Sequence, residues 1–184
     1  MHASVMDFVE RVLPTEKIKG AKVLEVGSHN INGSVRPFIE QYGPEMYIGV
    51  DMQKGPGVDL VANCERLVKN MGGDAWDIVV STEMLAHVDN WRICMRQMTW
   101  AVAPGGLFLL TTRSPGFPYQ PFPVDNWRFT TNDMERIIEA LRLQTVVIED
   151  DKEAPGVFML ARKPLRLHVP GSLEHIWVGG VDHG

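Results

Sequence analysis

Short apolar runs alternate along the chain with segments in which apolar residues recur at every third or fourth position. Runs bounded by Gly, Pro, Asn or Asp predict buried strands, and the longer spacing predicts amphipathic helices. Strands are predicted at residues 22–26, 47–51, 58–61, 75–80 and 107–112, and helices at residues 4–13, 34–42, 64–70, 90–102 and 132–141. The run at 107–112 is almost wholly apolar, which indicates a central strand covered on both faces.

Two further apolar runs follow these predicted strands and helices. Residues 144–148 and 157–161 are separated by an acidic stretch and by Pro155-Gly156, which predicts an antiparallel hairpin. The whole pattern predicts an α/β fold with a mostly parallel, seven-stranded sheet and an antiparallel hairpin at its C-terminal end. We expect one domain over residues 1–164, of which 1–20 form an N-terminal helix and a lead-in. Residues 165–184 are expected to form a tail that packs loosely or meets a partner.

The ends of the first two predicted strands carry the most informative residues. The first strand leads through Glu25 into Gly27 and a short polar turn that reaches Gly33, and the second strand ends in Asp51. In an open α/β sheet, such a turn and such an acid meet in a crevice at the carboxyl ends of neighbouring strands. A carboxylate there can accept hydrogen bonds from the two hydroxyls of a ribose. The pattern therefore predicts a site for a nucleoside cofactor.

Five ordered segments give the chain a family resemblance. They are residues 23–27, 49–51, 76–81, 84–88 and 103–107, the last reading Ala-Pro-Gly-Gly-Leu. In this order and spacing the chain resembles class I S-adenosylmethionine-dependent methyltransferases. The resemblance implies a Rossmann-like, doubly wound sheet and S-adenosyl-L-methionine as the cofactor.

The resemblance also implies which residues bind that cofactor. They come from the ends of the first four strands: Glu25, Gly27, Ser28, His29, Asn32, Gly33, Asp51, Met52, Asn63, Cys64 and Ser81. Asp51 would hold the ribose, Met52 would lie against the adenine, and Glu25 would order the turn and meet the methionine moiety. Each assignment has a structural alternative: Glu25 as a solvated strand-end acid, Met52 as a core methionine, and Asn63 as a helix cap.

The first turn departs from the family pattern. Only Gly27 and Gly33 remain, while His29, Asn30 and Asn32 stand where glycine or another small residue is usual. Because asparagine tolerates left-handed backbone conformations, such a turn can still form.

Two residues are candidates for a general base. His87 lies just beyond the fourth strand, where a neutral imidazole could take a proton from an acceptor hydroxyl near neutral pH. Asp125 lies in the long loop that follows the fifth strand. The alternative for each is a structural role, for Asp125 as the partner of Arg128.

That loop spans residues 113–129, and its residues 115–129 are the predicted wall of the acceptor site. Its aromatic residues supply rigid apolar surface, and its prolines indicate a stiff lid. The acceptor-binding candidates are Glu83, Tyr119, Trp127 and Arg128, with Phe117 and Phe122 as further wall residues. Alternatively, Trp127 and Phe129 only anchor the loop to the core.

The composition limits which classes of partner we expect the protein to bind. The 184 residues include 18 Lys and Arg against 23 Asp and Glu, a net charge of −5, which argues against nucleic acid or an anionic membrane. Cys64 and Cys94 lack metal-ligand spacing, so we expect reduced thiols, no metal and a cytoplasmic protein. We see neither a signal-peptide pattern nor an apolar run long enough for a membrane span. The sequence leaves open whether the chain forms a homodimer.

The predicted function is methyl transfer from S-adenosyl-L-methionine to a small-molecule or sugar-like acceptor, at oxygen or nitrogen. A nicotinamide-dependent oxidoreductase would need a Gly-x-Gly-x-x-Gly turn, of which residues 27–32 supply only the first glycine. The remaining alternative is a non-catalytic scaffold or binding protein that retains the fold.

Overall fold

The computed structural model describes residues 2–120, 124–166 and 169–181. Its strands are β1 (Lys22–Val26), β2 (Met46–Asp51), β3 (Leu60–Val61), β4 (Trp76–Thr82), β5 (Val102–Arg113), β6 (Trp127–Arg128), β7 (Gln144–Asp150), β8 (Gly156–Arg162) and β9 (Gly179–Gly180). Its α-helices are α1 (Ala3–Val12), α2 (Arg36–Glu40), α3 (Leu67–Met71), α4 (Trp91–Ala101) and α5 (Thr131–Ala140). Short 3-10 helices lie at η1 (Thr15–Lys17), η2 (Cys64–Arg66) and η3 (Leu85–His87).

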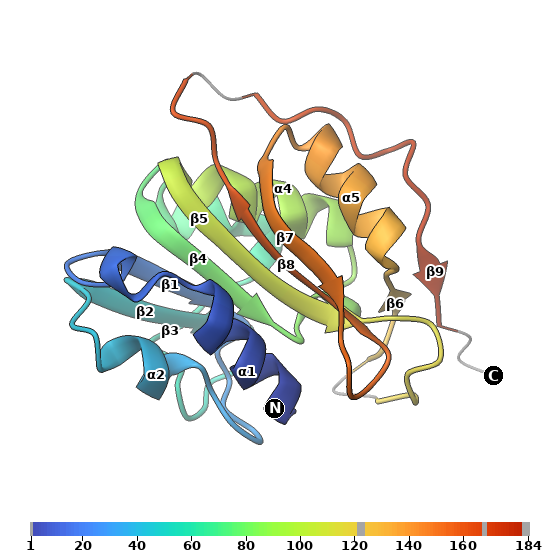
Figure 1. The fold of residues 1–184 in the computed structure, drawn as a ribbon, viewed down its shortest axis with the longest axis horizontal. Helices are drawn as coiled ribbons and strands as arrows, with labels where there is room; N and C mark the ends of the chain where they lie inside the picture. Colours follow the sequence, from blue (N-terminus) through green and yellow to red (C-terminus); the bar gives the residue numbers. More distant parts are fainter. Residues whose placement is uncertain (1, 121–123, 167–168, 182–184) are drawn as a thin grey trace.

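Seven of the strands in the described part of the chain form one mixed sheet (Figure 1). The order is β3-β2-β1-β4-β5-β8-β7; β1 to β5 pair in parallel, and β8 is antiparallel to both β5 and β7. The predicted α/β class, doubly wound sheet and antiparallel hairpin are therefore confirmed. The strand order reverses between β1 and β4, which is where sheets of this kind bind ligands.

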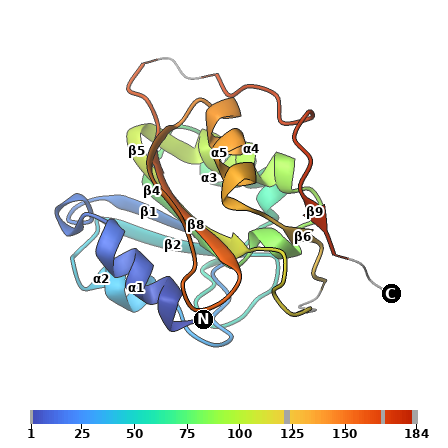
Figure 2. The ribbon, with the colours of Figure 1, turned by 45° about the vertical axis from the view of Figure 1, so that its right-hand side comes forward.

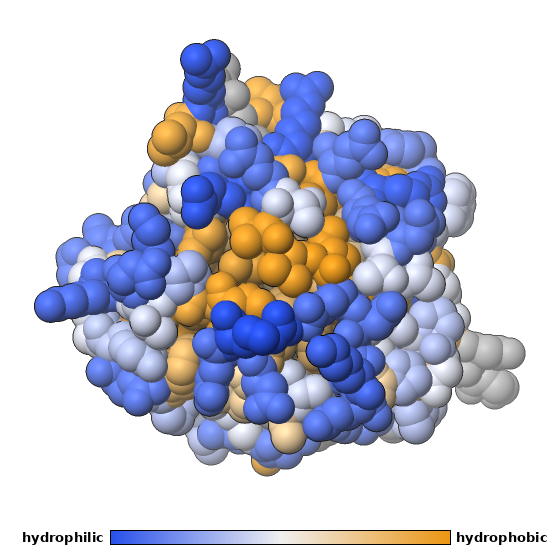
Figure 3. All heavy atoms as spheres, viewed as in Figure 1, coloured by the Kyte–Doolittle hydropathy of each residue, from blue (hydrophilic) through white to orange (hydrophobic). Residues whose placement is uncertain are grey.

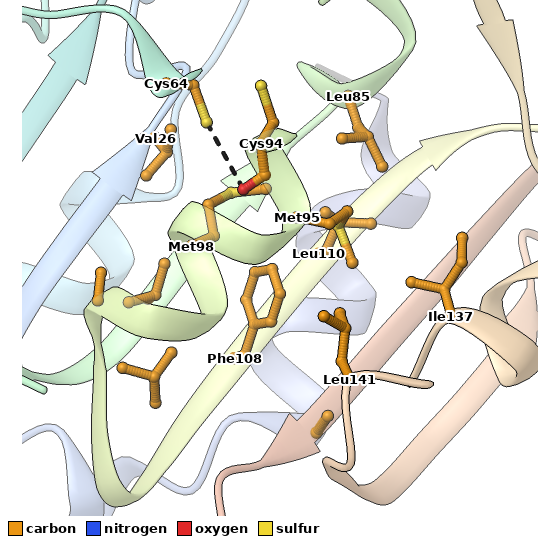
Figure 4. Packing of buried hydrophobic residues seen from close by; sticks show 14 of the residues in the cluster. Val26, Cys64, Leu85, Cys94, Met95, Met98, Phe108, Leu110, Ile137 and Leu141 are labelled. Atoms are coloured by element: carbon orange, nitrogen blue, oxygen red, sulfur yellow. Dashed lines mark hydrogen bonds between the residues drawn. The ribbon is translucent and has the colours of Figure 1, made fainter. Parts of the chain in front are cut away.

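Helices cover both faces of the sheet (Figures 1 and 2). On one face, α1 and α2 pack over the inward side chains of alternate positions, such as Val23 and Leu109. On the other face, α3, α4 and α5 cover the complementary positions, such as Leu24 and Phe108. The second core, shown in Figure 4, contains Cys64 and the α4 side chains Cys94, Met95 and Met98. On the first face, apolar side chains come to the surface beside α1, over β5 and the β7–β8 hairpin (Figure 3).

One buried charged side chain lies at the end of the second core, next to the C-terminal end of α4. Lys163, directly after β8, is only 2% exposed. Its ammonium donates to the carbonyls of Thr99 and Val102, at the C-terminal end of α4, and to Asp74 Oδ1. The positive charge lies at the negative end of the helix dipole, so it satisfies terminal carbonyls that α4 itself leaves unpaired.

The tail is more ordered than predicted. Gly171 N donates to the carbonyl of Ala140 at the end of α5, and Leu173 and Ile176 are buried in the second core. Farther on, β9 pairs antiparallel with β6, a short strand inside the long loop. Residues 171–176 therefore pack along α5 and α4 (Figure 2), whereas Trp177 is 79% exposed. The tail is thus anchored at a few points, which the sequence did not predict because Leu173 and Ile176 give no periodic pattern.

Two element boundaries also differ from the sequence prediction. The helix predicted over 34–42 contracts to α2, because the polar turn extends to Val35. The strand predicted over 107–112 begins at Val102, directly after α4, and includes the Pro-Gly-Gly segment. Gly105 and Gly106 hydrogen-bond with Lys163 there, so the glycines lie beyond the end of α4 and pair with the chain directly after β8.

Candidate active site

The carboxyl ends of β1, β2 and β4 meet at the point where the strand order reverses. Gly27 has φ +83°, and a Cβ there would lie 2.5 Å from Cβ of Met84, so only glycine fits. The amides of Gly27 and Ser28 both donate to the carbonyl of Val50, at 2.9 and 3.1 Å. The turn after β1 is thereby fixed against the end of β2.

Asp51 ends β2 at this edge, beside the turn that follows β1. Its Oδ2 accepts from His29 N at 3.2 Å, and its Oδ1 accepts from Gln53 N at 2.9 Å. The side chain is half-buried. Each carboxylate oxygen has a second lone pair beyond these backbone contacts, so both can accept a further hydrogen bond from a ligand.

The rest of the first turn packs on the Gly55-Pro56-Gly57 turn. The His29 ring occupies the space that a Cβ of Gly55 would need, and Asn30 N donates to the carbonyl of Pro56. Gly33 has φ +129°, and its amide donates to Asn30 Oδ1. Among the described residues, only Asp74, Glu83 and Arg142 combine a side chain with positive φ. The asparagines therefore build the turn without the left-handed conformation that the sequence allowed.

Glu25 is held inside the sheet edge. It is 2% exposed, and its Oε2 accepts a hydrogen bond of 2.9 Å from the Tyr47 hydroxyl. Burial raises the pKa of Glu25 to about 7, although the Tyr47 hydrogen bond and the charge of Arg36 oppose the shift. The alternative of a solvated strand-end acid is therefore wrong. Its predicted contact with the cofactor stays a prediction.

The residues predicted to lie around the adenine are arranged as follows. Met52 is 60% exposed, which excludes the alternative of an ordinary core methionine. Asn63 Oδ1 accepts from Glu65 N at 2.7 Å, so Asn63 caps η2. Cys64 follows it into the second core, where burial and the neighbouring Cys94 thiol raise the pKa of its own thiol (Figure 4). Ser81 is wholly buried, and its hydroxyl has no partner among the described residues.

Glu83 follows β4 in a strained conformation, with φ +63°. Its Oε1 accepts from the Thr111 hydroxyl at 2.8 Å, and its other oxygen pairs with the Arg113 guanidinium. Arg113 is buried, stacks on the Phe117 ring at 4.3 Å and also pairs with Asp151 at 3.0 Å. These contacts fix the Glu83 carboxylate at the edge of the crevice.

His87 ends η3 and is half-buried. Its Nδ1 lies 2.7 Å from the carbonyl oxygen of Val124. A carbonyl can only accept a hydrogen bond, so Nδ1 carries the proton and Nε2 of the neutral ring keeps a lone pair. In a neutral ring, this contact therefore selects the tautomer with Nδ1–H, in which Nε2 can accept a proton.

Asp125 and Arg128 form an internal pair. Arg128 reaches both oxygens of Asp125, at 2.5 and 2.6 Å, and Gln120 N adds a third hydrogen bond. Burial alone would raise the pKa of Asp125, but the Arg128 guanidinium and the Gln120 amide hold it below its ordinary value. At 1% exposure, Asp125 takes the structural role that the sequence left open. A role as the base finds no support in this geometry.

The other predicted acceptor residues lie on the same loop. Trp127 is half-buried and donates from Nε1 to the carbonyl of Val88 at 2.7 Å, so it anchors the loop to η3. Tyr119 is largely exposed. Phe122 lies outside the described residues. Arg128 is buried with Asp125 and is placed to stiffen the loop.

Sequence reasoning missed Arg113 and the Val124 carbonyl. Arg113 is a charge at the end of a wholly buried run, a signal that could have been used. The Val124 carbonyl could not have been found, because a backbone oxygen has no residue-type signature.

Comparisons with known proteins show the family and the fold of the chain. The family model described as "Methyltransferase domain" matches residues 1–145. The chain has the architecture of S-adenosylmethionine-dependent methyltransferases. It belongs to the methyltransferase domain family. No protein of curated function matches its sequence.

Three solved structures illustrate the likeness of fold. An S-adenosylmethionine-dependent methyltransferase from Mesorhizobium loti has a TM-score of 0.72 at 15% identity, covering 88% of this chain and 98% of that one. The 1,6-didemethyltoxoflavin-N1-methyltransferase of Burkholderia thailandensis, solved with its substrate and S-adenosylhomocysteine, has a TM-score of 0.68 at 16% identity, covering 88% and 79%. A SAM-dependent methyltransferase from Archaeoglobus fulgidus has a TM-score of 0.68 at 15% identity, covering 86% and 93%.

The described residues show neither a membrane-spanning helix nor a metal-binding cluster. Over the part of the chain that the structure describes, no helix has the length and apolarity needed to span a bilayer. Over the same residues, no group of three His, Cys, Asp or Glu side chains could hold a metal ion.

Proposed function

We propose that this methyltransferase moves the methyl group of S-adenosyl-L-methionine to a small-molecule acceptor, with His87 as the general base for a hydroxyl. The observation that carries the proposal is the hydrogen bond of 2.7 Å between His87 Nδ1 and the Val124 carbonyl. An amine acceptor that arrives uncharged needs no base to attack. A histidine held with its basic nitrogen available therefore favours oxygen over nitrogen.

The described residues fit the cofactor at the edge where β1, β2 and β4 end. Asp51 would accept the ribose hydroxyls, and the turn from Gly27 to Gly33 would enclose the methionine moiety. Met52, Asn63 and Cys64 would border the adenine. Two buried hydroxyls, those of Ser28 and Ser81, have no partner within the described residues. Such orphaned groups at strand ends suit a polar ligand, because a buried hydroxyl without a partner costs free energy.

The cofactor supplies an electrophilic methyl group on a sulfonium, which is a good leaving group. The protein then has to hold the acceptor in line and exclude water, and neither task requires a nucleophile on the protein. His87 would accept the hydroxyl proton at Nε2. Because Asp125 is engaged with Arg128 on both oxygens, we assign the base to His87 alone.

The acceptor would lie between Glu83 and the long loop. Glu83, fixed by Thr111 and Arg113, offers carboxylate oxygens to an acceptor hydroxyl, and Tyr119 and Trp127 offer apolar surface. The net charge of −5 supports a small molecule over nucleic acid. Both cysteines are free and buried, which supports the expected cytoplasmic location.

The cofactor site is tested by calorimetric titration with S-adenosylmethionine and S-adenosylhomocysteine. We expect micromolar binding, and a loss of between about tenfold and a hundredfold in Asp51→Ala, since two charge-assisted hydrogen bonds disappear. The matched control is Asp59→Ala, an acid on the same side of the sheet whose carboxylate contacts Gly49 N and Arg36. If neither ligand binds the wild-type protein, the cofactor assignment is wrong.

The base is tested by screening hydroxylated small molecules for methylated product by mass spectrometry. In His87→Gln we expect kcat to fall about a hundredfold or more, with cofactor affinity unchanged. Asp89→Ala, an exposed acid two residues away, is the control. Cofactor binding without product on any acceptor would favour the scaffold alternative. Equal rates for wild type and His87→Gln would exclude the base.

A further inference from the structure

The C-terminal strap, defined here as residues 171–181, lies against the loop that orients His87. We propose that this strap is a positioning element of the active site: it holds the loop so that the Val124 carbonyl keeps His87 in its proton-accepting form. This proposal rests on the proposed function in one respect, the assignment of His87 as the general base. Three sets of contacts connect His87 to α4: from His87 to the loop, from the loop to β9, and from the strap to α4.

The first link joins the loop to the 3-10 helix that carries His87. Besides the His87–Val124 contact, Asn126 N donates to the carbonyl of Ala86 at 2.8 Å. Asn126 Nδ2 and Trp127 Nε1 both donate to the carbonyl of Val88, at 3.1 and 2.7 Å. Loop and η3 therefore move as one unit only while these hydrogen bonds hold.

The second link joins the same loop residues to the strap. Gly180 pairs with Trp127 and Gly179 with Arg128, and Val181 N donates to the carbonyl of Asn126 at 2.9 Å. Asn126 is thus held on two sides, by η3 through its donors and by the strap through its carbonyl. Figure 2 shows β9 beside β6 at the edge of the molecule, away from the main sheet.

The third link anchors the strap independently of the loop. Arg92 of α4 donates from Nε to the carbonyl of Leu173 at 3.1 Å and from Nη2 to that of Ile176 at 2.6 Å. The side chains of Leu173 and Ile176 are buried in the second core. The strap therefore gives the loop a further attachment to α4, besides the Phe129 ring, whose centroid lies 5.6 Å from that of Trp91.

The strap also lies beyond the stretch that the family model matches, which ends at residue 145. Gly179 and Gly180 are exposed, so removing β9 takes away ladder hydrogen bonds and little buried apolar surface. A truncation there should loosen the loop and leave the fold intact, which separates positioning from stability.

The experiment compares the full chain with a chain truncated after Val178, by nitrogen-15 NMR of the histidine side chains. The His87 signal is identified by its absence in His87→Gln. We expect Nδ1–H in the full chain and a mixture of tautomers after truncation. With a hydroxyl acceptor, kcat should fall between about tenfold and a hundredfold, while KM for the cofactor is unchanged. Truncation after Val181, which keeps β9, is the matched control and should behave as the full chain.

A second variant covers the case in which truncation unfolds the chain. Val181→Pro removes one backbone N–H, the donor to Asn126, and should shift the tautomer in the same direction. An unchanged tautomer and unchanged kcat in whichever of these variants folds would overturn the strap proposal. A shifted tautomer in a protein that binds no cofactor would instead support the strap and contradict the proposed function. The two failures are therefore distinguishable.

Discussion

The two sides of the crevice are held together in different ways. On the cofactor side, polar groups are fixed by near neighbours in the chain or across the adjoining strands β1 and β2. Asn63 accepts from the amide two residues on and Asn30 from the amide three residues on, while the Asp51–His29 and Glu25–Tyr47 hydrogen bonds each span 22 residues. On the acceptor side, the partners are distant. His87 and Val124 are 37 residues apart, Glu83 and Thr111 are 28 apart, and Arg92 reaches Ile176 across 84 residues.

This difference has a consequence for how each side tolerates change. A site built from short turns and two adjoining strands survives as long as those strands stay paired. A site built from distant segments fails when any one of them detaches, because local opening depends on the weakest contacts around it. We therefore expect substitutions on the acceptor side to change both stability and catalysis, and those on the cofactor side to act more locally.

The largest expected effect comes from breaking the buried pair in the acceptor loop. Asp125→Ala leaves the Arg128 guanidinium buried without its carboxylate, and we expect a loss of roughly 3–5 kcal/mol in the free energy of unfolding. Urea denaturation measures it, with Asp7→Ala on the exposed face of α1 as a control near zero. A loss below about 1 kcal/mol would mean that the pair does not anchor the loop.

Next comes Glu25, the buried acid on the cofactor side. Its pKa is raised from 4.5 to about 7, so the folded state holds a proton that the unfolded state releases between those values. The free energy of unfolding of the wild type should therefore fall as the pH rises from about 4.5 to about 7. Glu25→Gln, which cannot ionise, should escape a loss of roughly 3 kcal/mol over that range.

Thermal and urea unfolding at pH 5 and pH 8 measure this difference. Tyr47→Phe is the matched control: without the hydroxyl that lowers the pKa of Glu25, the fall with pH should steepen. Parallel pH profiles for wild type and Glu25→Gln would contradict the raised pKa.

The smallest effect separates the two roles of Asn63. Asn63→Ala removes the cap of η2 and should cost about 1 kcal/mol, whereas Asn63→Asp keeps an acceptor oxygen and should cost little. If Asn63 also contacts the adenine, the alanine variant should bind the cofactor roughly three- to tenfold more weakly in calorimetry. Equal losses of stability in both variants would show that the cap is not what stabilises η2.

The local side of this comparison is also the side that the sequence predicted well. Residue type and position identify strand ends such as Glu25 and Asp51, and also the cap at Asn63. The same holds for the stop signal at Pro104-Gly105-Gly106. The strands of the main sheet, their parallel arrangement and the terminal hairpin followed from apolar runs and turn residues alone.

The long-range side could not be predicted in the same way. Two-residue strands such as β6 and β9 are too short to show alternation, and Gly179-Gly180 reads as a flexible linker. The partner of His87 is a backbone carbonyl, and the burial of Leu173 and Ile176 depends on α4. The sequence alone made His87 a candidate base, but only the folded chain shows that the Val124 carbonyl occupies its Nδ1.

Lys163 offers a way to observe this molecule without an assay for its reaction. All three protons of its ammonium are engaged and the side chain is buried, so reagents that acylate amines can reach it only when the chain after β8 separates from α4. Exposed lysines such as Lys19 and Lys54 will react at once. The rate at which Lys163 is labelled, measured by mass spectrometry, therefore reports how often this half of the protein opens.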